Sequence, residues 1–323
     1  MSLTTDDISN QPRSSTSLEK YVCIASIGHS GSTLLGMLLD QHPQMIAMGE
    51  MTNVAIFAGD PSRKCGCGVP VAQCEFWNAV QDELRRRHDD PTLQLASFAV
   101  QPVQRKTAFR HIPSLSEVLQ LLGSRRLWRL GKGISRRVQF ELQYGQRAVS
   151  IYEAVAAAHQ KPIVVNSTGH ATYMKSIYLA DPARFRLLHI VRDGRGWTRS
   201  MIRRDRATME FAAKVWARSR WNSDMMMASI PKRQRLLLRY EDLCRDPGGT
   251  LARVGQFLGV QMPSGEFKLS KQDFHGVGGN PMRFRYDEVD IHLDEKWRTE
   301  LSAADLRTFE RIAGKQNRRL GYE

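Results

Sequence analysis

Residues 21–50 read YVCIASIGHSGSTLLGMLLDQHPQMIAMGE. The apolar run Tyr21–Ile27 is long enough for one buried strand. The turn after it, Gly28–Thr33, contains two glycines and three hydroxyl residues, and the apolar spacing of Leu34–Leu39 predicts a helix that ends near Pro43. A strand, a glycine-rich turn and a helix in this order form a site for an anion. The glycines let the backbone approach the anion's oxygens, and the N–H groups of the helix N-terminus point at them.

The turn lacks the lysine that is typical of nucleoside triphosphate loops. Such loops read GxxxxGK[ST], where the lysine contacts the outer phosphates and the hydroxyl after it binds magnesium. Here Gly28 and Gly31 are three residues apart, and Gly31 stands directly before Ser32. The turn therefore argues against ATP hydrolysis and favours a single phosphate or a phosphosulfate. A turn that binds no ligand is the alternative that this stretch alone leaves open.

Three further apolar runs are predicted strands, and each is followed by a polar turn or a helix. This alternation predicts a single α/β domain over residues 19–323, with a central parallel sheet flanked by helices on both faces. Ligands of such sheets bind beyond the carboxyl ends of the strands, and three polar turns fall at those ends. The runs are 162–166, 185–191 and 235–239, and the turns are 28–33, 166–170 and 192–200.

The totals are those of a globular protein with an anionic partner. Of the 323 residues, 41% are hydrophobic and 25% are charged, and the net charge is +14. A charge of this sign favours a nucleotide, a nucleic acid, an acidic polysaccharide or a membrane surface. Residues 1–18 are polar, so we expect a disordered tail rather than a secretory signal. No apolar run approaches the length of a membrane span, so we expect a cytoplasmic protein without stable membrane insertion.

Three cysteines form part of a metal-binding pattern. Cys65 and Cys67 make a C-x-C pair, and Cys74 follows seven residues later. A structural zinc site needs four ligands, and no fourth lies nearby in the sequence. Plain buried thiols, or a disulfide that pins a loop, are therefore favoured, and no metal is predicted. The five cysteines of the chain suggest a reducing compartment.

An arginine-rich helical insertion at about residues 85–150 has two interpretations. Such charge runs are usually solvated helix faces, and the functional alternative is a cationic wall on the acceptor side. Few aromatic residues lie between these arginines, so we do not predict nucleic-acid binding. The glycine-rich segment 276–285, with Arg283 and Arg285, is either a lid over a nucleotide or an ordinary surface loop.

Three blocks resemble those of the PAPS-dependent sulfotransferases. Ser30–Leu35, with Asp40 and His42-Pro43, resembles the family's 5′-phosphosulfate loop. Residues 190–195, through Ser200, resemble the 3′-phosphate motif, and Arg239–Leu243 with Asp246-Pro247 resembles a third block. The blocks span about residues 21 to 260 without the arginine-rich middle. Their order is most similar to that of tyrosylprotein and bacterial carbohydrate sulfotransferases.

The resemblance implies a P-loop-like fold and a specific reaction. A sulfuryl group would pass from 3′-phosphoadenosine 5′-phosphosulfate (PAPS) to a hydroxyl of a carbohydrate or other small natural product. The product would be adenosine 3′,5′-bisphosphate (PAP), and no metal would be required. Arg192 would bind the 3′-phosphate bidentately, with Ser200 as a further donor. The candidate nucleotide ligands are His29, Ser30, Gly31, Ser32, Thr33, Leu34, Arg192, Ser200, Arg204 and Tyr240, and from the glycine-rich segment Gly279, Asn280 and Arg283.

The candidate catalytic residues are Glu50, His29 and His170. The tyrosylprotein branch uses the second of two consecutive glutamates as base, and Met51 holds that position here, so Glu50 requires a shift of one residue. His29 stands where the family usually has lysine or arginine, and the turn at His170 lacks the lysine of many members. We therefore expect these histidines to replace the usual cations. The alternatives are a P-loop small-molecule kinase and a nucleotide- or polyanion-binding protein without catalysis. The sequence specifies neither the acceptor nor the oligomeric state.

Overall fold

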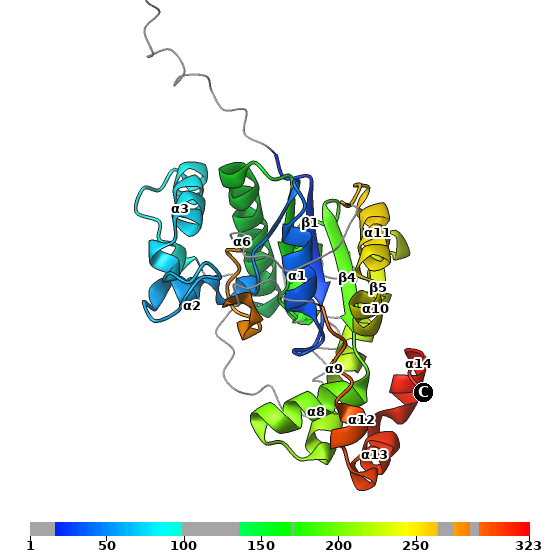
Figure 1. Cartoon of the computed structure of the whole chain (residues 1–323). Coiled ribbons are helices and arrows are strands. Elements are labelled where there is room, and N and C mark those ends of the chain that lie inside the picture. Colours follow the sequence, from blue (N-terminus) through cyan, green and yellow to red (C-terminus); the bar gives the residue numbers. More distant parts are fainter. Residues whose placement is uncertain (1–16, 99–135, 170, 264–273, 285–290) are drawn as a thin grey trace, which may run out of the picture.

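Five parallel strands form the centre of the fold. The computed structural model describes residues 17–98, 136–169, 171–263, 274–284 and 291–323 (Figure 1). The strand order in the sheet is β2-β3-β1-β4-β5, and every neighbouring pair is parallel. The strands are β1 (Lys20–Ala25), β2 (Met45–Ala47), β3 (Ile163–Asn166), β4 (Phe185–Val191) and β5 (Arg235–Arg239).

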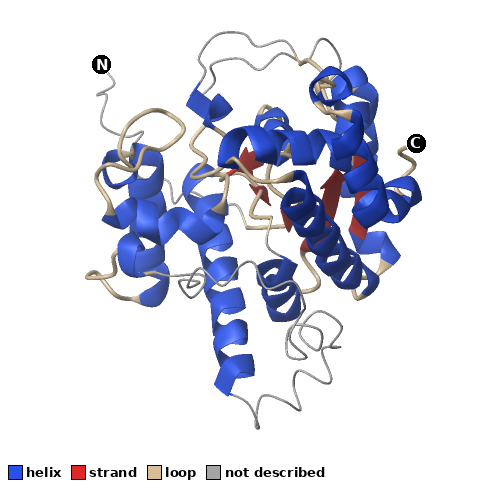
Figure 2. Ribbon diagram, turned by 90° about the horizontal axis from the view of Figure 1, so that it is seen from below, coloured by secondary structure: helices blue, strands red, loops and turns tan. Residues whose placement is uncertain are grey.

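Helices cover both faces of the sheet, because successive side chains of each strand point to opposite faces. Tyr21 and Cys23 belong to one apolar cluster, and Val22 and Ile24 belong to another. Figure 2 shows the strands with helices on both sides. The first cluster includes residues of α6 (Arg136–His159), α7 (Ala171–Ala180) and the end of α9 (Met209–Ala228), and the second includes residues of α1 (Ser32–Asp40), α10 (Tyr240–Arg245) and α11 (Pro247–Leu258).

Two further groups of helices flank this core. One group packs beside α6, and the other lies beyond the sheet, at the lower end of the molecule in Figure 1. A third apolar cluster, with Trp197, Trp216 and Phe309, holds the second group together. The first group is α2 (Val54–Gly59) and α3 (Glu75–His88); the second is α8 (Gly194–Asp205), α12 (Trp297–Glu300), α13 (Ala303–Phe309), the π-helical turn Glu310–Gly314 and α14 (Lys315–Arg319).

The α/β fold with one parallel sheet is confirmed, and the predicted strands 185–191 and 235–239 coincide with β4 and β5. The helical region after β4 is divided into two helices, α8 and α9. Arg206 ends α8 in a left-handed conformation with φ 53°, and the side chain of Thr208 caps α9 by accepting from the N–H of Phe211. The short strand β2 was not predicted.

Several sequence-based expectations fall on residues outside the described ranges. They are the tail up to residue 16, the arginine-rich segment 99–135, His170, and Arg285. The described chain includes Leu18 from the predicted tail, and this side chain is buried. Within the described residues, no helix combines the length and the apolar character needed to cross a membrane.

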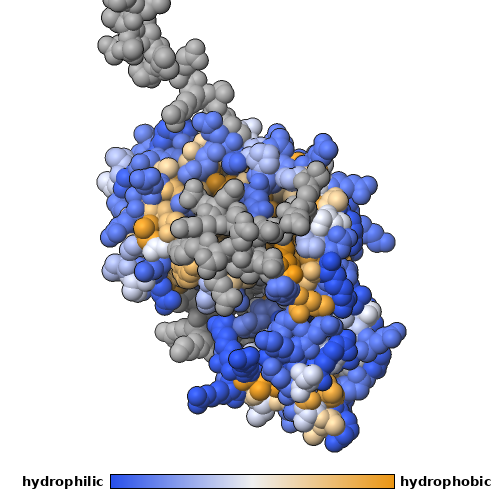
Figure 3. Space-filling view, viewed as in Figure 1, coloured by the Kyte–Doolittle hydropathy of each residue, from blue (hydrophilic) through white to orange (hydrophobic). Residues whose placement is uncertain are grey.

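Apolar side chains of the described residues are largely kept between the layers. Outside the grey atoms, hydrophilic residues cover most of the face shown in Figure 3. The large hydrophobic side chains that remain exposed in the described ranges are Ile56, Val69 and Leu237. Since they come from three different elements, we base no binding site on them.

Candidate functional site

The three predicted polar turns meet at the carboxyl edge of the sheet. Strand β1 pairs in parallel with both β3 and β4, so the turns that follow these strands are neighbours. The N–H of Ser167 donates to the carbonyl of Gly49 at 2.9 Å. A guanidinium N–H of Arg192 donates to the carbonyl of His29 at 3.0 Å. The sheet topology thus brings three separate segments of the sequence to one site.

The turn Gly28–Thr33 presents a helix N-terminus to this site. Two of its residues have positive φ, 66° at His29 and 87° at Gly31. A Cβ at Gly31 would lie 2.6 Å from the ring of Tyr240, so this position requires glycine. The first N–H of α1 that bonds back into the turn is that of Leu35, to Gly31 at 2.9 Å. The N–H groups before it have no acceptor within the helix and favour an anion.

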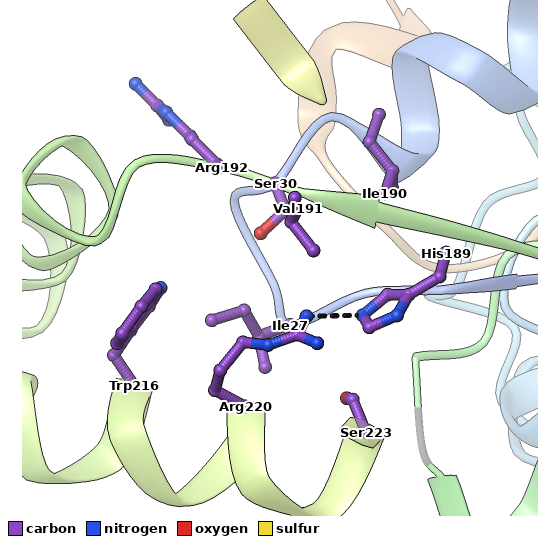
Figure 4. A pocket seen from close by; sticks show the side chains of 9 residues that line it. All are labelled: Ile27, Ser30, His189, Ile190, Val191, Arg192, Trp216, Arg220 and Ser223. Carbon is purple, nitrogen blue, oxygen red and sulfur yellow. Dashed lines mark hydrogen bonds between the residues drawn. The ribbon is translucent and has the colours of Figure 1, made fainter. Parts of the chain in front are cut away.

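The hydroxyl of Ser30 faces a small cavity behind the turn. Figure 4 shows this cavity between the turn, the end of β4 and the side chains of α9. Arg220 and His189 form a 2.8 Å hydrogen bond there, and the Ser30 Oγ has no hydrogen-bond partner among the described residues. Arg192 also lines this cavity, and its guanidinium points away from Arg220 and His189. The hydroxyl of Ser30 therefore does not face the guanidinium of Arg192, and only the backbone of Ser30 remains as a ligand on that side.

Arg192, Ser200 and Tyr240 lie together on the outer side of the turn. Arg192 is buried directly after β4, and its Nη1 lies 3.4 Å from the Oγ of Ser200 on the following helix, α8. The guanidinium lies over the ring of Tyr240, with its central carbon 4.7 Å from the ring centroid. The ring of Tyr240 in turn packs against Gly31. A cation and a hydroxyl, which donates to the carbonyl of Gly196 at 3.0 Å, thus lie next to the candidate anion site of α1.

The carboxylate of Asp294 occupies the position in front of Arg192. Its Oδ2 lies 3.0 Å from the Nη2 of Arg192 and 3.4 Å from the Nη1 of Arg199. Partial burial raises the pKa of Asp294, but the hydrogen bond and the charge of Arg192 outweigh it, and the pKa lies below its ordinary value. Asp294 is therefore ionised at neutral pH. A phosphate that binds Arg192 has to displace this carboxylate.

Arg204 is a cation next to His29 of the turn. The Nη1 of Arg204 lies 3.3 Å from the Nε2 of His29. Burial lowers the pKa of His29, and the positive charges of Arg204 and Arg192 lower it further. The neutral form of His29 is thus favoured in the free protein, and its role in place of the usual lysine stays a prediction. The second histidine of that expectation, His170, lies outside the described residues.

Glu50 lies next to the glycine-rich segment. Its backbone N–H donates to the carbonyl of Val277 at 2.6 Å, and its Oε2 accepts from the amide of Asn53 at 2.8 Å. A Cβ at Gly278 would lie 2.9 Å from Oε2 of Glu50, so the close approach needs glycine. The backbone N–H of Asn280 donates to Oγ1 of Thr33 at 3.2 Å. The candidate base therefore stands beside the N-terminus of α1.

Arg283 stabilises the glycine-rich segment from within. Its guanidinium is buried, and Nη1 donates to the carbonyls of Gly278 and Gly279. Gly279 and Asn280 are exposed, as an arriving ligand requires. Of the three candidate ligands in this segment, Arg283 thus acts as a support for the other two.

Three arginines of the predicted insertion, all on α3, form surface ion pairs. Arg85 pairs with Asp82 at 3.0 Å, and Arg86 and Arg87 pair with Glu83 at 2.6 and 2.7 Å. These partners lie within four residues on the same helix, and Arg87 also pairs with Glu153 of α6 at 3.2 Å. This part of the run is a solvated helix face, while residues 99–135 lie outside the described ranges.

Comparison with known proteins identifies the family. A family model described as the sulfotransferase family matches residues 22–264. The chain belongs to the sulfotransferase family. The match includes the turn Gly28–Thr33, Arg192 with Ser200, and Tyr240, so the residues gathered at the sheet edge come from the part of the chain that defines the family. A search of curated protein sequences finds no match.

A solved structure shows the same fold. This sulfotransferase is similar to the sulfotransferase domain of the olefin synthase from Synechococcus PCC 7002, with 17% identity, a TM-score of 0.52 and coverage of 94% of this chain and 98% of that chain. The sulfotransferase domain from the curacin biosynthetic pathway gives 17% identity and a TM-score of 0.49 over 95% and 98%. Sulfotransferase STF1 from Mycobacterium tuberculosis gives 14% identity and a TM-score of 0.43, with coverage of 93% of this chain and 78% of that chain.

Proposed function

We propose that this sulfotransferase moves the sulfuryl group of PAPS to a hydroxyl of a carbohydrate or another small natural product. The observation that supports the proposal is a pair of adjacent candidate anion sites. One is the N-terminus of α1, and the other is Arg192 with Ser200, linked to the first by the 3.0 Å bond from Arg192 to the carbonyl of His29. PAPS carries a 5′-phosphosulfate and a separate 3′-phosphate, and a nucleoside triphosphate has no use for the second site.

The chemistry needs little beyond position, charge and a base. The acceptor oxygen attacks the sulfur in line with the bridging oxygen, and the hydroxyl proton passes to the carboxylate of Glu50. A new S–O bond forms as the bridging S–O bond breaks, and its electron pair stays on the 5′-phosphate of PAP. The free N–H groups of α1 stabilise that charge, as donors do in phosphoryl transfer.

Two alternatives differ in measurable ways. A P-loop kinase would bind ATP with magnesium, but the missing lysine and the family membership oppose it. A binding protein without catalysis would bind PAP or an anionic polymer and transfer nothing. The experiment is therefore done in two parts. PAP should raise the melting temperature more than ATP with magnesium does, and labelled sulfate from PAPS should pass to a member of a panel of hydroxyl acceptors.

The thermal-shift experiment and the transfer experiment test different parts of the proposal. No thermal shift with PAP at millimolar concentration would contradict nucleotide binding. A shift without transfer to any acceptor of the panel would favour the binding protein without catalysis.

Asp294→Asn is expected to tighten PAP binding by about fivefold to tenfold, on the order of 1 kcal/mol. The carboxylate competes with the 3′-phosphate for Arg192, and the amide keeps its shape without the charge. Titration calorimetry measures the change. Glu295→Gln is the control, because it removes a neighbouring exposed charge that pairs with Arg245 and Arg298 instead. Weaker binding in Asp294→Asn would show that Asp294 orients Arg192 for the ligand.

His29 is expected to make PAP binding depend on pH. Its pKa is lowered in the free protein, and a bound 5′-phosphate would raise it, so binding takes up a proton. The affinity gain from His29 should therefore grow as the pH falls from about 8 to about 6. The phosphates of PAP also titrate near pH 6, so the measured quantity is the ratio of Kd between His29→Gln and wild type. A ratio that does not change with pH would contradict this role.

A further inference from the structure

Three cysteines and one histidine meet at a point that the proposed reaction does not use. The Sγ atoms of Cys65, Cys67 and Cys74 and the Nδ1 of His275 all lie within 4.8 Å of one another. His275 is 201 residues from Cys74 in the sequence, so the pattern of the cysteines gave no sign of it. No fourth ligand lies near the three cysteines in the sequence, but His275 lies next to them in the folded structure.

Four of the six distances in the cluster are close to the edges of a metal-centred tetrahedron, and the other two are within 4.8 Å. Cys74 Sγ lies 3.7 Å from the sulfur of Cys65 and 3.7 Å from that of Cys67, and the Nδ1 of His275 lies 3.3 Å from Cys74 and 3.7 Å from Cys65. Tetrahedral zinc, with Zn–S of about 2.3 Å and Zn–N of about 2.0–2.1 Å, gives edges of about 3.8 Å between sulfurs and about 3.6 Å from sulfur to nitrogen. A disulfide needs about 2.05 Å. The three thiols are free in this structure.

The local backbone holds the three sulfurs in a form suited to metal binding. Cys65 and Cys67 lie in a tight turn, where the N–H of Gly68 donates to the carbonyl of Cys65 at 2.9 Å and Gly68 has φ 95°. Cys74 is the N-cap of α3. Each sulfur accepts a backbone N–H, from Cys67, Val69 and Trp77 respectively. Such hydrogen bonds stabilise thiolates, which are the form that binds metal.

The imidazole of His275 is oriented by its own contacts. Its ring stacks on Phe76 with centroids 4.8 Å apart and an interplanar angle of 7°. Its carbonyl accepts from the indole N–H of Trp77 at 3.0 Å. Next to it, a Cβ at Gly66 would lie 2.3 Å from the carbonyl of Phe274, so the cysteine turn and the histidine segment pack with no space for a side chain. These contacts point Nδ1 at the sulfurs.

We propose that Cys65, Cys67, Cys74 and His275 bind one Zn²⁺ in a structural site. Three thiolates and an imidazole in tetrahedral arrangement are a ligand set typical of zinc, and four protein ligands leave no open position for catalysis. The metal joins the turn before α3 to the segment Phe274–Phe284. Two residues after His275, Val277 accepts from the N–H of Glu50, and Asn280 contacts Thr33. Zinc therefore anchors the segment that lies beside the candidate base.

Metal analysis of the purified full chain tests the site directly. Mass spectrometry of the metal content should find about one zinc per chain, and Co²⁺ exchanged into the protein should give the visible bands of tetrahedral thiolate coordination. Cys74→Ser and His275→Gln should lose the metal. Cys244→Ser should keep it, because Cys244 is a buried cysteine of α10 outside the cluster. His275→Cys should also keep it, because it restores a fourth ligand and shows that loss in His275→Gln is not misfolding.

A folded, metal-free wild-type chain whose melting temperature does not change with added Zn²⁺ would overturn the proposal. Zinc retained in both Cys74→Ser and His275→Gln would do the same, as would a disulfide within the cluster in protein purified under reducing conditions. The readouts are metal content and melting temperature, so neither depends on nucleotide binding or sulfuryl transfer.

Discussion

Arg192→Ala is expected to weaken PAP binding by roughly 30-fold or more, about 2 kcal/mol. The guanidinium is buried and held in place by Tyr240, Ser200 and the carbonyl of His29, so its charge is available to a phosphate at little entropic cost. Removing it leaves the 3′-phosphate with a hydroxyl as its partner. The PAP affinity of Arg192→Lys should lie between those of wild type and Arg192→Ala, since lysine keeps the charge without the bidentate geometry.

The control for Arg192 is an equal loss of charge far from the site. Arg233 is exposed and lies in the 3-10 turn Lys232–Gln234, just before β5 and hence at the amino edge of the sheet. Arg233→Ala should leave PAP affinity unchanged, because surface charges beyond a Debye length of about 8–10 Å are screened. If Arg192→Ala bound PAP as tightly as wild type, Arg192 would not be part of the nucleotide site.

Glu50→Gln is expected to slow turnover by about 100-fold or more and to leave PAP affinity unchanged. The amide retains an oxygen that accepts from Asn53, so the side chain keeps its position while losing its basicity. Labelled transfer under saturating PAPS measures turnover, and calorimetry measures PAP affinity. The matched control is Glu19→Gln, an exposed glutamate directly before β1 at the amino edge. Wild-type turnover in Glu50→Gln would exclude Glu50 as the base.

The sheet was predictable because it is buried on both faces. Strands of this kind are short continuous apolar runs, and polar turns mark their ends. Phe185–Val191 was therefore located to the residue. Arg235–Arg239, a partly buried edge strand, was located by its apolar run although Leu237 is exposed. Strand β2 has only three residues, which is too short for a periodic signal. The break between α8 and α9 depends on the left-handed conformation of Arg206. Arginine has no preference for this conformation, so the sequence does not indicate it.

Some residues of the site could likewise be predicted from local sequence patterns, and others could not. Arg192 and Ser200 follow a strand at a fixed spacing, so a local pattern shows them. Asp294 contacts Arg192 across 102 residues, and His275 completes the cysteine cluster across 201, so neither leaves a local trace. The protonation of His29 is a further property that no local pattern specifies. Its protonation depends on burial and on Arg204, which only the folded arrangement brings beside it.

Nucleotide selectivity tests the central claim, which is that the second anion site recognises a 3′-phosphate. Titration calorimetry of wild type with PAP and with adenosine 5′-phosphate compares two ligands that differ only in that group. PAP should bind at least about tenfold more tightly, a difference of about 1.4 kcal/mol, and the preference should disappear in Arg192→Ala. Equal affinity of wild type for the two ligands would contradict the account.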